Sequence, residues 1–321
     1  MENIGECKLT TRDDTTTLGN TGIAVSALGI GTWQWGDKLL WGYGGDYTDA
    51  DAQAAFEAAL KAGVNFFDTA ELYGSGTSER LLGRFIRAAQ AEERVIVATK
   101  FMPFPWRLRR GELVRALRRS LERLGMARVD LYQIHWPLPP LSVETWMEGM
   151  ADAVEAGLTG AVGVSNYNAD QMRRAQARLA RRGLQLTSNQ VSYSLLNRAV
   201  ERNGVLAACR ELGVTLIAYS PIEKGMLSGK YTPQNLPPGV RRGRYGAAYL
   251  AKVQPLIGLL REIGQGRGGK TPSQVSLNWL MRKGALPIPG VKNVKQVEEN
   301  VGALGWRLSA EEVAALDQIP F

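Results

Sequence analysis

The stretch Val129-Asp-Leu-Tyr-Gln-Ile-His135 is an apolar, strand-like run that ends on the only histidine of the 321-residue chain. Runs of this kind are typical of a strand that is buried on both faces of a parallel sheet. The histidine stands where this strand meets a loop that is rich in tryptophan and proline, at residues 136–140. A single imidazole in that position indicates a chemical role, and a histidine satisfied within the core is the alternative.

Three other apolar runs also end on polar residues. Residues 65–68 end at Asp68 and lead on to Tyr73, residues 95–100 end at Lys100, and residues 160–166 end at a Ser-Asn pair. A segment with apolar residues at helical spacing follows each run. The four polar ends would then face the same way.

Eight strand-like runs of this kind alternate with helical segments, without a linker or a change of composition between them. The runs cover residues 28–33, 65–68, 95–100, 129–135, 160–166, 186–190, 214–219 and 286–289. This pattern predicts an α/β chain with one (β/α)8 domain, a TIM barrel, over residues 1–321. Active sites of this fold lie at the carboxyl ends of the strands, so the polar ends are expected to meet in one pocket.

Some predicted segments lie outside the alternation. A β-hairpin is expected over residues 15–25, extra helices near the carboxyl terminus, and a long functional or mobile loop over residues 220–245. Residues 1–14 lack an apolar centre and are expected to form a flexible tail rather than a signal peptide.

Composition excludes several classes of protein. With 45% hydrophobic and 22% charged residues the chain is typical of a globular protein, and no apolar stretch is long enough to predict a membrane span. Two distant cysteines indicate a reducing, cytoplasmic location. The net charge of +8 is spread over helix faces, so a nucleic-acid partner is not expected. One histidine makes a metal-dependent hydrolase difficult to build, and no metal is expected.

Seven short motifs together carry a family resemblance. They are Phe67-Asp68-Thr-Ala-Glu-Leu-Tyr73-Gly, Thr99-Lys100, Ile134-His135-Trp136, Gly163-Val-Ser165-Asn166, Asn189-Gln190, Ala218-Tyr219-Ser-Pro221 and Ile288-Pro-Gly290. From about residue 17 to residue 321 the chain resembles the aldo-keto reductases in both the order and the spacing of these motifs. The resemblance implies reduction of aldehydes or ketones to alcohols with NADPH, and catalytic roles for Asp68, Tyr73, Lys100 and His135.

The chemistry of carbonyl reduction suits these four side chains. Hydride addition builds negative charge on the carbonyl oxygen, so a proton donor must lie close to it. Tyr73 is the candidate donor, although a free phenol has a pKa of about 10 and is a reluctant acid. A nearby Lys100 ammonium is expected to lower that pKa, and Asp68 to pair with the ammonium. A neutral His135 would hold the substrate oxygen or help to pass the proton.

The resemblance also implies the position of the cofactor. No G-x-G-x-x-G follows the first strand, so a Rossmann site is not predicted. The nicotinamide would lie in the barrel mouth, next to Thr32 and Trp33, stacked on Tyr219, with its carboxamide held by Ser165, Asn166 and Gln190. The pyrophosphate would run along Ser220, Met226, Leu227, Ser228 and Lys230. The adenosine 2′-phosphate and adenine would meet Gly290, Lys292, Asn293, Gln296, Glu299 and Asn300, which favours NADP over NAD.

Tryptophans in the loops after the strands are expected to form flat apolar walls of a substrate pocket, namely Trp35, Trp41, Trp106 and Trp136, with Trp33 beside them. Such walls suit an aromatic or otherwise planar aldehyde or ketone, although the same residues could instead cover the core of the barrel. The chain ends soon after its last predicted helix, without the long carboxyl-terminal loop that narrows the pocket in many aldo-keto reductases, so the resemblance implies a more open pocket and broader specificity. A monomer is the state that the resemblance implies.

Two alternatives remain open. A regulatory or redox-sensing subunit would bind NADPH with little turnover. An aldolase would use Lys100 to form a Schiff base, for which the amine must lose its proton, and pairing with Asp68 opposes that loss.

Overall fold

The strands of the computed structural model, which describes residues 14–239 and 241–321, form one parallel barrel. In chain order they are β3 (Ile30–Gly31), β4 (Phe66–Asp68), β5 (Ile96–Phe101), β6 (Val129–Ile134), β7 (Thr159–Ser165), β8 (Leu186–Ser192), β9 (Thr215–Tyr219) and β10 (Ala285–Pro287). Each strand pairs in parallel with the next one along the chain. A parallel bridge between Gly31 and Gly290 joins the first strand to the segment after the last. The predicted (β/α)8 fold is confirmed.

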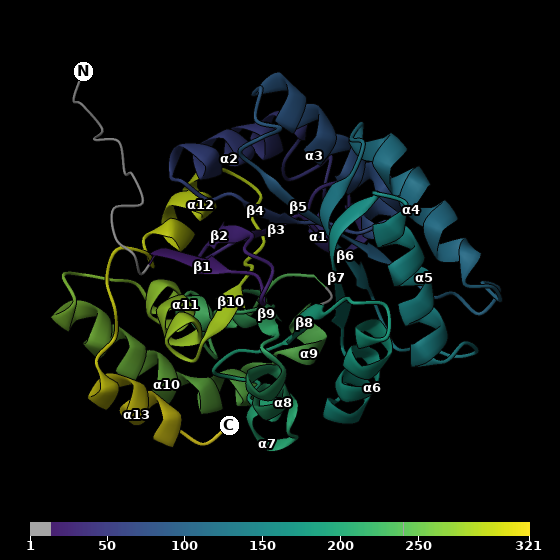
Figure 1. Cartoon of the computed structure of the whole chain (residues 1–321). Coiled ribbons are helices and arrows are strands. Elements are labelled where there is room, and N and C mark those ends of the chain that lie inside the picture. The colour runs from purple at the N-terminus through teal and green to yellow at the C-terminus, as the bar shows by residue number, and fades with distance from the viewer. Residues whose placement is uncertain (1–13, 240) are drawn as a thin grey trace.

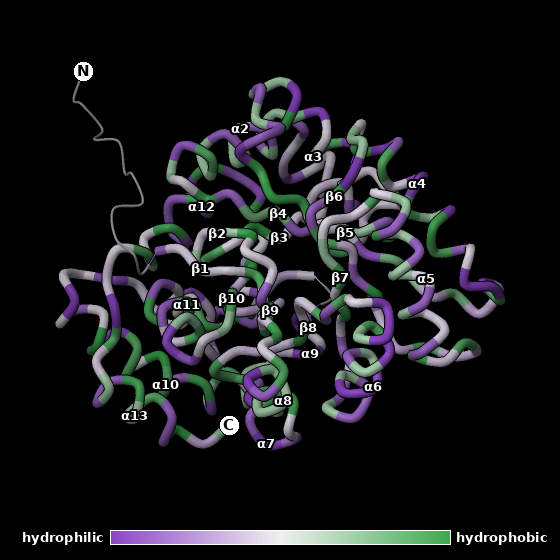
Figure 2. Tube along the Cα trace, viewed as in Figure 1, coloured by the Kyte–Doolittle hydropathy of each residue, from purple (hydrophilic) through white to green (hydrophobic). Residues whose placement is uncertain are grey.

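Helices surround the strands, as Figure 1 shows. They include α2 (Asp49–Lys61), α3 (Thr77–Ala88), α4 (Gly111–Leu124), α5 (Val143–Glu155), α6 (Ala169–Ala180), α8 (Val205–Leu212), α11 (Pro272–Arg282) and α12 (Val294–Val301), with α10 (Ala247–Gly266) and α13 (Ala310–Gln318) as additional helices. Helix α4 is representative, because Leu113, Leu117 and Leu124 are buried while Arg115, Arg118 and Arg119 are exposed. Figure 2 shows this alternation of hydrophobic and hydrophilic residues along the outer helices.

The predicted hairpin closes the amino-terminal end of the barrel. It consists of β1 (Thr15–Thr17) and β2 (Ala24–Ser26), which pair antiparallel. Leu18 and Val25 pack against barrel-interior residues such as Leu131, and the Gly19 N–H donates to Thr215 Oγ1 at the start of β9, 2.7 Å away. The carboxyl ends of the strands are therefore the end that remains open for a site.

One segment shows a break within its helix, and another corrects a prediction. The segment after β8 forms two helices, α7 (Ala199–Arg202) and α8, because Gly204 takes a left-handed conformation with φ of 82° between them. Most of the predicted tail lies outside the described residues, but Asp14 is buried and its Oδ1 accepts a hydrogen bond from the Gly305 N–H. The prediction of a flexible tail is therefore wrong at Asp14.

The two long loops at the carboxyl ends of β3 and β9 carry short helical segments. The loop after β3 contains α1 (Lys38–Trp41), and the loop after β9 contains the 3-10 turn η3 (Glu223–Ser228) and α9 (Arg241–Arg244). Both loops contribute walls to the cavity described below. Among the helices of the described residues, none is long and apolar enough to cross a membrane.

Candidate active site

A cavity of about 1070 Å³ opens at the carboxyl ends of the strands. Asp68, Tyr73 and His135 line one part of it, and Lys292 and Asn293, at the amino end of α12, line another. The polar strand ends of the sequence therefore do meet in one place. The lining therefore includes both the barrel mouth and the amino end of a helix, where backbone N–H groups favour an anion.

Lys100 is the centre of the polar network beneath the cavity. Its ammonium donates to Asp68 Oδ1, to the Thr69 carbonyl oxygen at 2.9 Å and to the Tyr73 hydroxyl at 3.1 Å. An ammonium has three N–H donors, so all of them are used. This arrangement opposes the Schiff-base alternative, because a nucleophilic amine needs a free lone pair.

Burial and charge set the protonation states of this network. Burial opposes the charge on Lys100, but Asp68 and Tyr73 outweigh it and raise the pKa of Lys100 above its usual value. Burial also raises the pKa of Tyr73, and the nearby Lys100 charge lowers it by less. The predicted lowering of the Tyr73 pKa by Lys100 is present, but burial and the Asp68 charge outweigh it, so the pKa of Tyr73 lies above its usual value. Tyr73 is protonated at neutral pH, which is the state that a proton donor requires.

His135 follows β6 and is neutral at physiological pH. Burial and the Lys100 charge lower its pKa to about 3. Its ring lies edge-on to the Tyr73 ring with centroids 5.9 Å apart, and its buried Nδ1 has no hydrogen-bond partner among the described residues. A neutral imidazole keeps one N–H, and because His135 lines the cavity it can offer this hydrogen bond to an oxygen that enters beside Tyr73.

Two glutamines complete the surroundings of Asp68. Asp68 Oδ2 accepts from Gln133 Nε2 at 3.0 Å and from Gln190 Nε2 at 2.8 Å. Gln190 was a predicted site residue, and Gln133 was not. Its signal was present in the sequence, because residues two apart on a strand share a face and Gln133 is two residues before His135.

Most residues proposed for the cofactor do line the cavity. They are Trp33, Ser165, Asn166, Gln190, Tyr219, Ser220, Ser228, Lys230, Gly290, Lys292, Asn293, Gln296, Glu299 and Asn300. The side chains of Thr32, Met226 and Leu227 are buried and do not. Thr32 instead hydrogen-bonds Ser78 and the Asp68 carbonyl oxygen, while the two apolar side chains pack into the core.

Lys292 is held between the loop after β3 and the amino end of α12. Its ammonium donates to the Trp41 carbonyl oxygen at 2.6 Å and lies over the Tyr47 ring, 4.7 Å from the centroid. Burial lowers the pKa of Lys292, and the charges of Arg241 and Lys230 add to this effect. These cations make one part of the cavity positively charged.

The tryptophans divide into two groups. Trp33, Trp41 and Trp136 line the cavity, and the Trp33 ring lies 6.1 Å from the Tyr73 ring with an angle of 25° between their planes. Trp35 is fully buried and its Nε1 donates to the Val291 carbonyl oxygen. Trp106 is 71% exposed and stacks on Phe104 outside the cavity. The predicted pocket roles of Trp35 and Trp106 are therefore wrong.

Comparison with known proteins identifies the family. The family model described as "Aldo/keto reductase family" matches residues 27–320. The chain belongs to the aldo/keto reductase family. It is 44% identical over 306 residues to the chloroplastic pyridoxal reductase of Arabidopsis thaliana, covering 92% of this chain and 83% of the relative. It is 34% identical over 284 residues to the aldo-keto reductase yakc [NADP(+)] of Schizosaccharomyces pombe, covering 83% and 81% of the two chains.

A solved structure supports the same assignment. The crystal structure of a thermostable aldo-keto reductase, in complex with the inhibitor epalrestat, superposes with a TM-score of 0.77 and 32% sequence identity. The match covers 95% of this chain and 99% of the other. Membership of the family indicates that this aldo-keto reductase is an oxidoreductase.

The described residues of this aldo-keto reductase also include an ion pair that sequence reasoning did not identify. Glu71 accepts from the Met102 N–H at 2.7 Å and from both terminal nitrogens of Arg107, at 2.6 and 3.0 Å. Arg107 in turn donates to the Met102 carbonyl oxygen. The pair fastens the loop after β5 to the segment that carries Tyr73.

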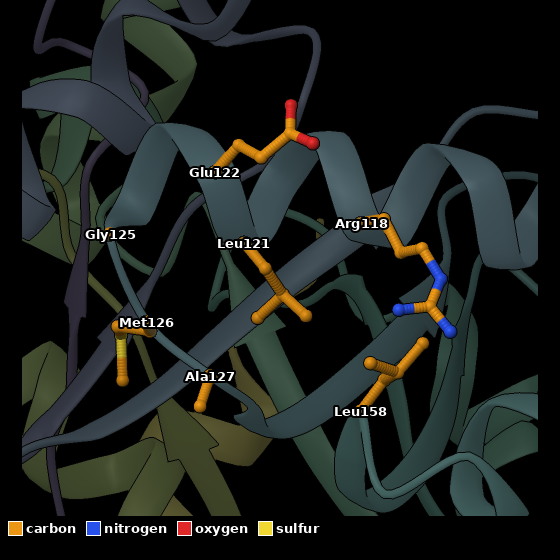
Figure 3. Close-up of a pocket in the computed structure, with 7 residues that line it drawn as sticks. All are labelled: Arg118, Leu121, Glu122, Gly125, Met126, Ala127 and Leu158. Atoms are coloured by element: carbon orange, nitrogen blue, oxygen red, sulfur yellow. The ribbon is translucent and has the colours of Figure 1, made fainter.

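A second hollow, drawn in Figure 3, lies at the opposite end of the barrel. Arg118, Leu121 and Glu122 of α4 line it, together with residues that precede β6 and β7. The described residues contain no cluster of side chains that would hold a metal ion, at this hollow or elsewhere.

Proposed function

We propose that the protein is a reductase that converts aldehydes or ketones to alcohols with NADPH, and that Tyr73 is the general acid. One observation carries the proposal. A phenol bonded to a buried ammonium, and a neutral imidazole, lie at one part of a cavity. Cationic groups and a helix amino end lie at another part of the same cavity.

The residues around the cavity fit a nicotinamide adenine dinucleotide phosphate, NADPH. When bound, NADPH supplies the hydride. Tyr219 and Gln190 line the mouth, where a flat ring and its carboxamide would need an aromatic face and an amide partner. Lys230 and Arg241, which line the cavity, would supply cations to the pyrophosphate, and Lys292, with the N-cap residue Asn293 beside it, would hold the 2′-phosphate. The yeast relative's name, which includes NADP(+), agrees with this preference.

Side chains of the protein can then donate the proton that the reduction requires. The carbonyl oxygen of the substrate would lie between the Tyr73 hydroxyl and the His135 ring, whose pKa keeps it uncharged. As negative charge develops on that oxygen, Tyr73 gives up its proton. The Lys100 ammonium, 3.1 Å from the phenol oxygen, stabilises the phenolate that remains. Asp68 keeps this lysine charged and in place.

The walls of the cavity favour flat substrates. Trp33, Trp41 and Trp136 line it, and aromatic side chains gain most from stacking on another planar ring. The Arabidopsis relative is named a pyridoxal reductase, and pyridoxal is a planar aromatic aldehyde. We therefore place planar aromatic aldehydes, pyridoxal first among them, ahead of aliphatic ones.

The test is NADPH oxidation, followed by its absorbance, with pyridoxal, benzaldehyde and an aliphatic aldehyde of similar size. We expect turnover with NADPH that exceeds turnover with NADH, and a higher kcat/KM for the two aromatic aldehydes. Tight NADPH binding without turnover of any carbonyl compound would instead support a regulatory or redox-sensing subunit.

We also propose a monomer that acts in the cytoplasm. The presence of only two cysteines in the sequence, Cys7 and Cys209, supports a reducing compartment. Sedimentation should then give a mass near 35.1 kDa, and a dimer mass would contradict the proposal.

A further inference from the structure

We infer that Gln133 is a positioning residue that aims Gln190 at the carboxamide of the nicotinamide, with Asp68 as the anchor of both glutamines. The inference rests on the proposed use of NADPH and extends it to a residue that does not touch the cofactor. Gln133 is fully buried and absent from the cavity wall, whereas Gln190 lines the cavity. Any effect of Gln133 on cofactor binding must therefore pass through its neighbours.

The geometry joins three side chains around one oxygen. Asp68 Oδ1 is occupied by the Lys100 ammonium, so Oδ2 is the oxygen that remains. It accepts from Gln133 Nε2 and from Gln190 Nε2, at 3.0 and 2.8 Å. Gln190 Nε2 also lies 3.4 Å from Gln133 Oε1. Gln190 is thus bonded by its nitrogen to both of the other groups.

This network decides which end of the Gln190 amide faces the cavity. A carboxylate paired with an ammonium only accepts hydrogen bonds, and the Gln133 oxygen accepts too. Both therefore select the NH₂ end of Gln190. Gln190 Oε1 is then the atom that stays available to a ligand, since it accepts no hydrogen bond from the described residues. An amide oxygen held in this way is suited to the NH₂ group of a nicotinamide carboxamide.

Space for Gln133 is provided by a glycine on the next strand. A Cβ at Gly163 of β7 would lie 3.1 Å from Gln133 Cγ and 2.2 Å from Ser188 Oγ. Because Gly163 has no side chain, the Gln133 side chain can take the position in which it reaches Asp68. Removal of the Gln133 amide would leave Gln190 with one anchor, Asp68 Oδ2, in place of two, so the orientation of its amide would be less strictly fixed.

The experiment compares two oxidised cofactors, NADP⁺ and its 3-acetylpyridine analogue, in which a methyl group replaces the carboxamide NH₂. We expect wild type to bind NADP⁺ about fivefold more tightly than the analogue, the equivalent of one hydrogen bond of about 1 kcal/mol. In Gln133→Met, which keeps an unbranched side chain of similar length, this ratio should fall to about twofold, the equivalent of losing about 0.5 kcal/mol, because Gln190 keeps its bond to Asp68 and loses the contact with Gln133. Gln133→Asn, whose amide is too short to reach Asp68, should behave alike and serves if the methionine variant does not fold.

A matched control separates loss of the Gln190 orientation from a general loss of stability. Gln176 is half-buried and its Oε1 accepts from the Leu186 N–H at 2.8 Å, fastening α6 to β8 away from the cavity. Gln176→Met should lower the thermal midpoint and leave the discrimination ratio unchanged. A wild-type ratio retained in folded Gln133→Met or Gln133→Asn would overturn the inference. Failure of wild type to bind NADP⁺ would overturn the proposed function, and the inference with it.

Discussion

Single residues of the site carry charges that are held out of water. The side chains of Lys100 and Asp68 are 0% and 1% exposed, so each charge is stabilised by the other. Removal of one partner leaves an uncompensated buried charge, which costs about 3 to 5 kcal/mol. We therefore expect Lys100→Met to lower the free energy of unfolding by that amount in urea titrations.

The matched double variant tests the origin of this loss. Lys100→Met combined with Asp68→Asn removes both charges, so it should lose less stability than the sum of the two single variants. Strictly additive losses would show that the two charges do not stabilise each other.

His135 predicts a specific pH dependence of stability. Its pKa is about 3 in the folded protein and about 6.5 when unfolded, so the unfolded state binds the extra proton between these values. Stability is therefore fully present above about pH 6.5 and should fall by about 1.4 kcal/mol for each pH unit below it. Urea unfolding of wild type and His135→Gln gives the free energy of unfolding at pH 7 and at pH 5. The contribution of His135 is the difference between the two proteins in how far this free energy falls between the two pH values. An equal fall in both proteins would mean that His135 is protonated in the folded protein.

Packing between elements leaves no room at one glycine of α3. A Cβ at Gly83 would lie 1.9 Å from the Leu124 carbonyl oxygen at the end of α4. Gly83→Ala should thus force α3 and α4 apart and cost about 1 to 3 kcal/mol. Gly111→Ala is the control, because nothing lies within 4 Å of its Cβ position at the start of α4, and it should be neutral or slightly stabilising. A neutral Gly83→Ala, measured by thermal unfolding, would contradict this packing.

The elements show how far the sequence predicts the structure. Strand ends such as those at Asp68 and Lys100 were predictable, because an apolar run with a polar end is a local signal. The break at Gly204 and the burial of Trp35 were not, since the first depends on one left-handed residue and the second on a hydrogen bond to distant Val291. For Gln133 the sequence indicates the face of the strand, since it stands two residues before His135, but not the bond to Asp68, which lies 65 residues away in sequence.

Across the whole molecule, positive charge gathers at one part of the cavity. Lys230, Arg241 and Lys292 all line it. Interactions between a phosphate and exposed cations weaken as salt screens them. We expect the Kd for NADPH to rise more steeply with ionic strength than the Kd for NADH, which lacks the 2′-phosphate.

Substitution of Lys292 tests which cation binds the 2′-phosphate. Lys292→Met should raise the Kd for NADPH by at least about tenfold, as for a lost charge-assisted hydrogen bond, with little change for NADH. The exposed Lys61 at the end of α2 provides the control, and Lys61→Met should change neither Kd. Equal losses for both cofactors in Lys292→Met would place the 2′-phosphate elsewhere.

The most direct test of the proton-donor role uses Tyr73→Phe. The variant removes the phenol oxygen that bonds Lys100 and keeps the aromatic ring, so NADPH should bind as in wild type by fluorescence titration. Turnover of an aldehyde with NADPH should fall by at least about 10²-fold, the scale of a lost general acid. Equal turnover by the two proteins would contradict the account, because the cavity would then reduce carbonyl groups without the donor on which the proposed mechanism depends.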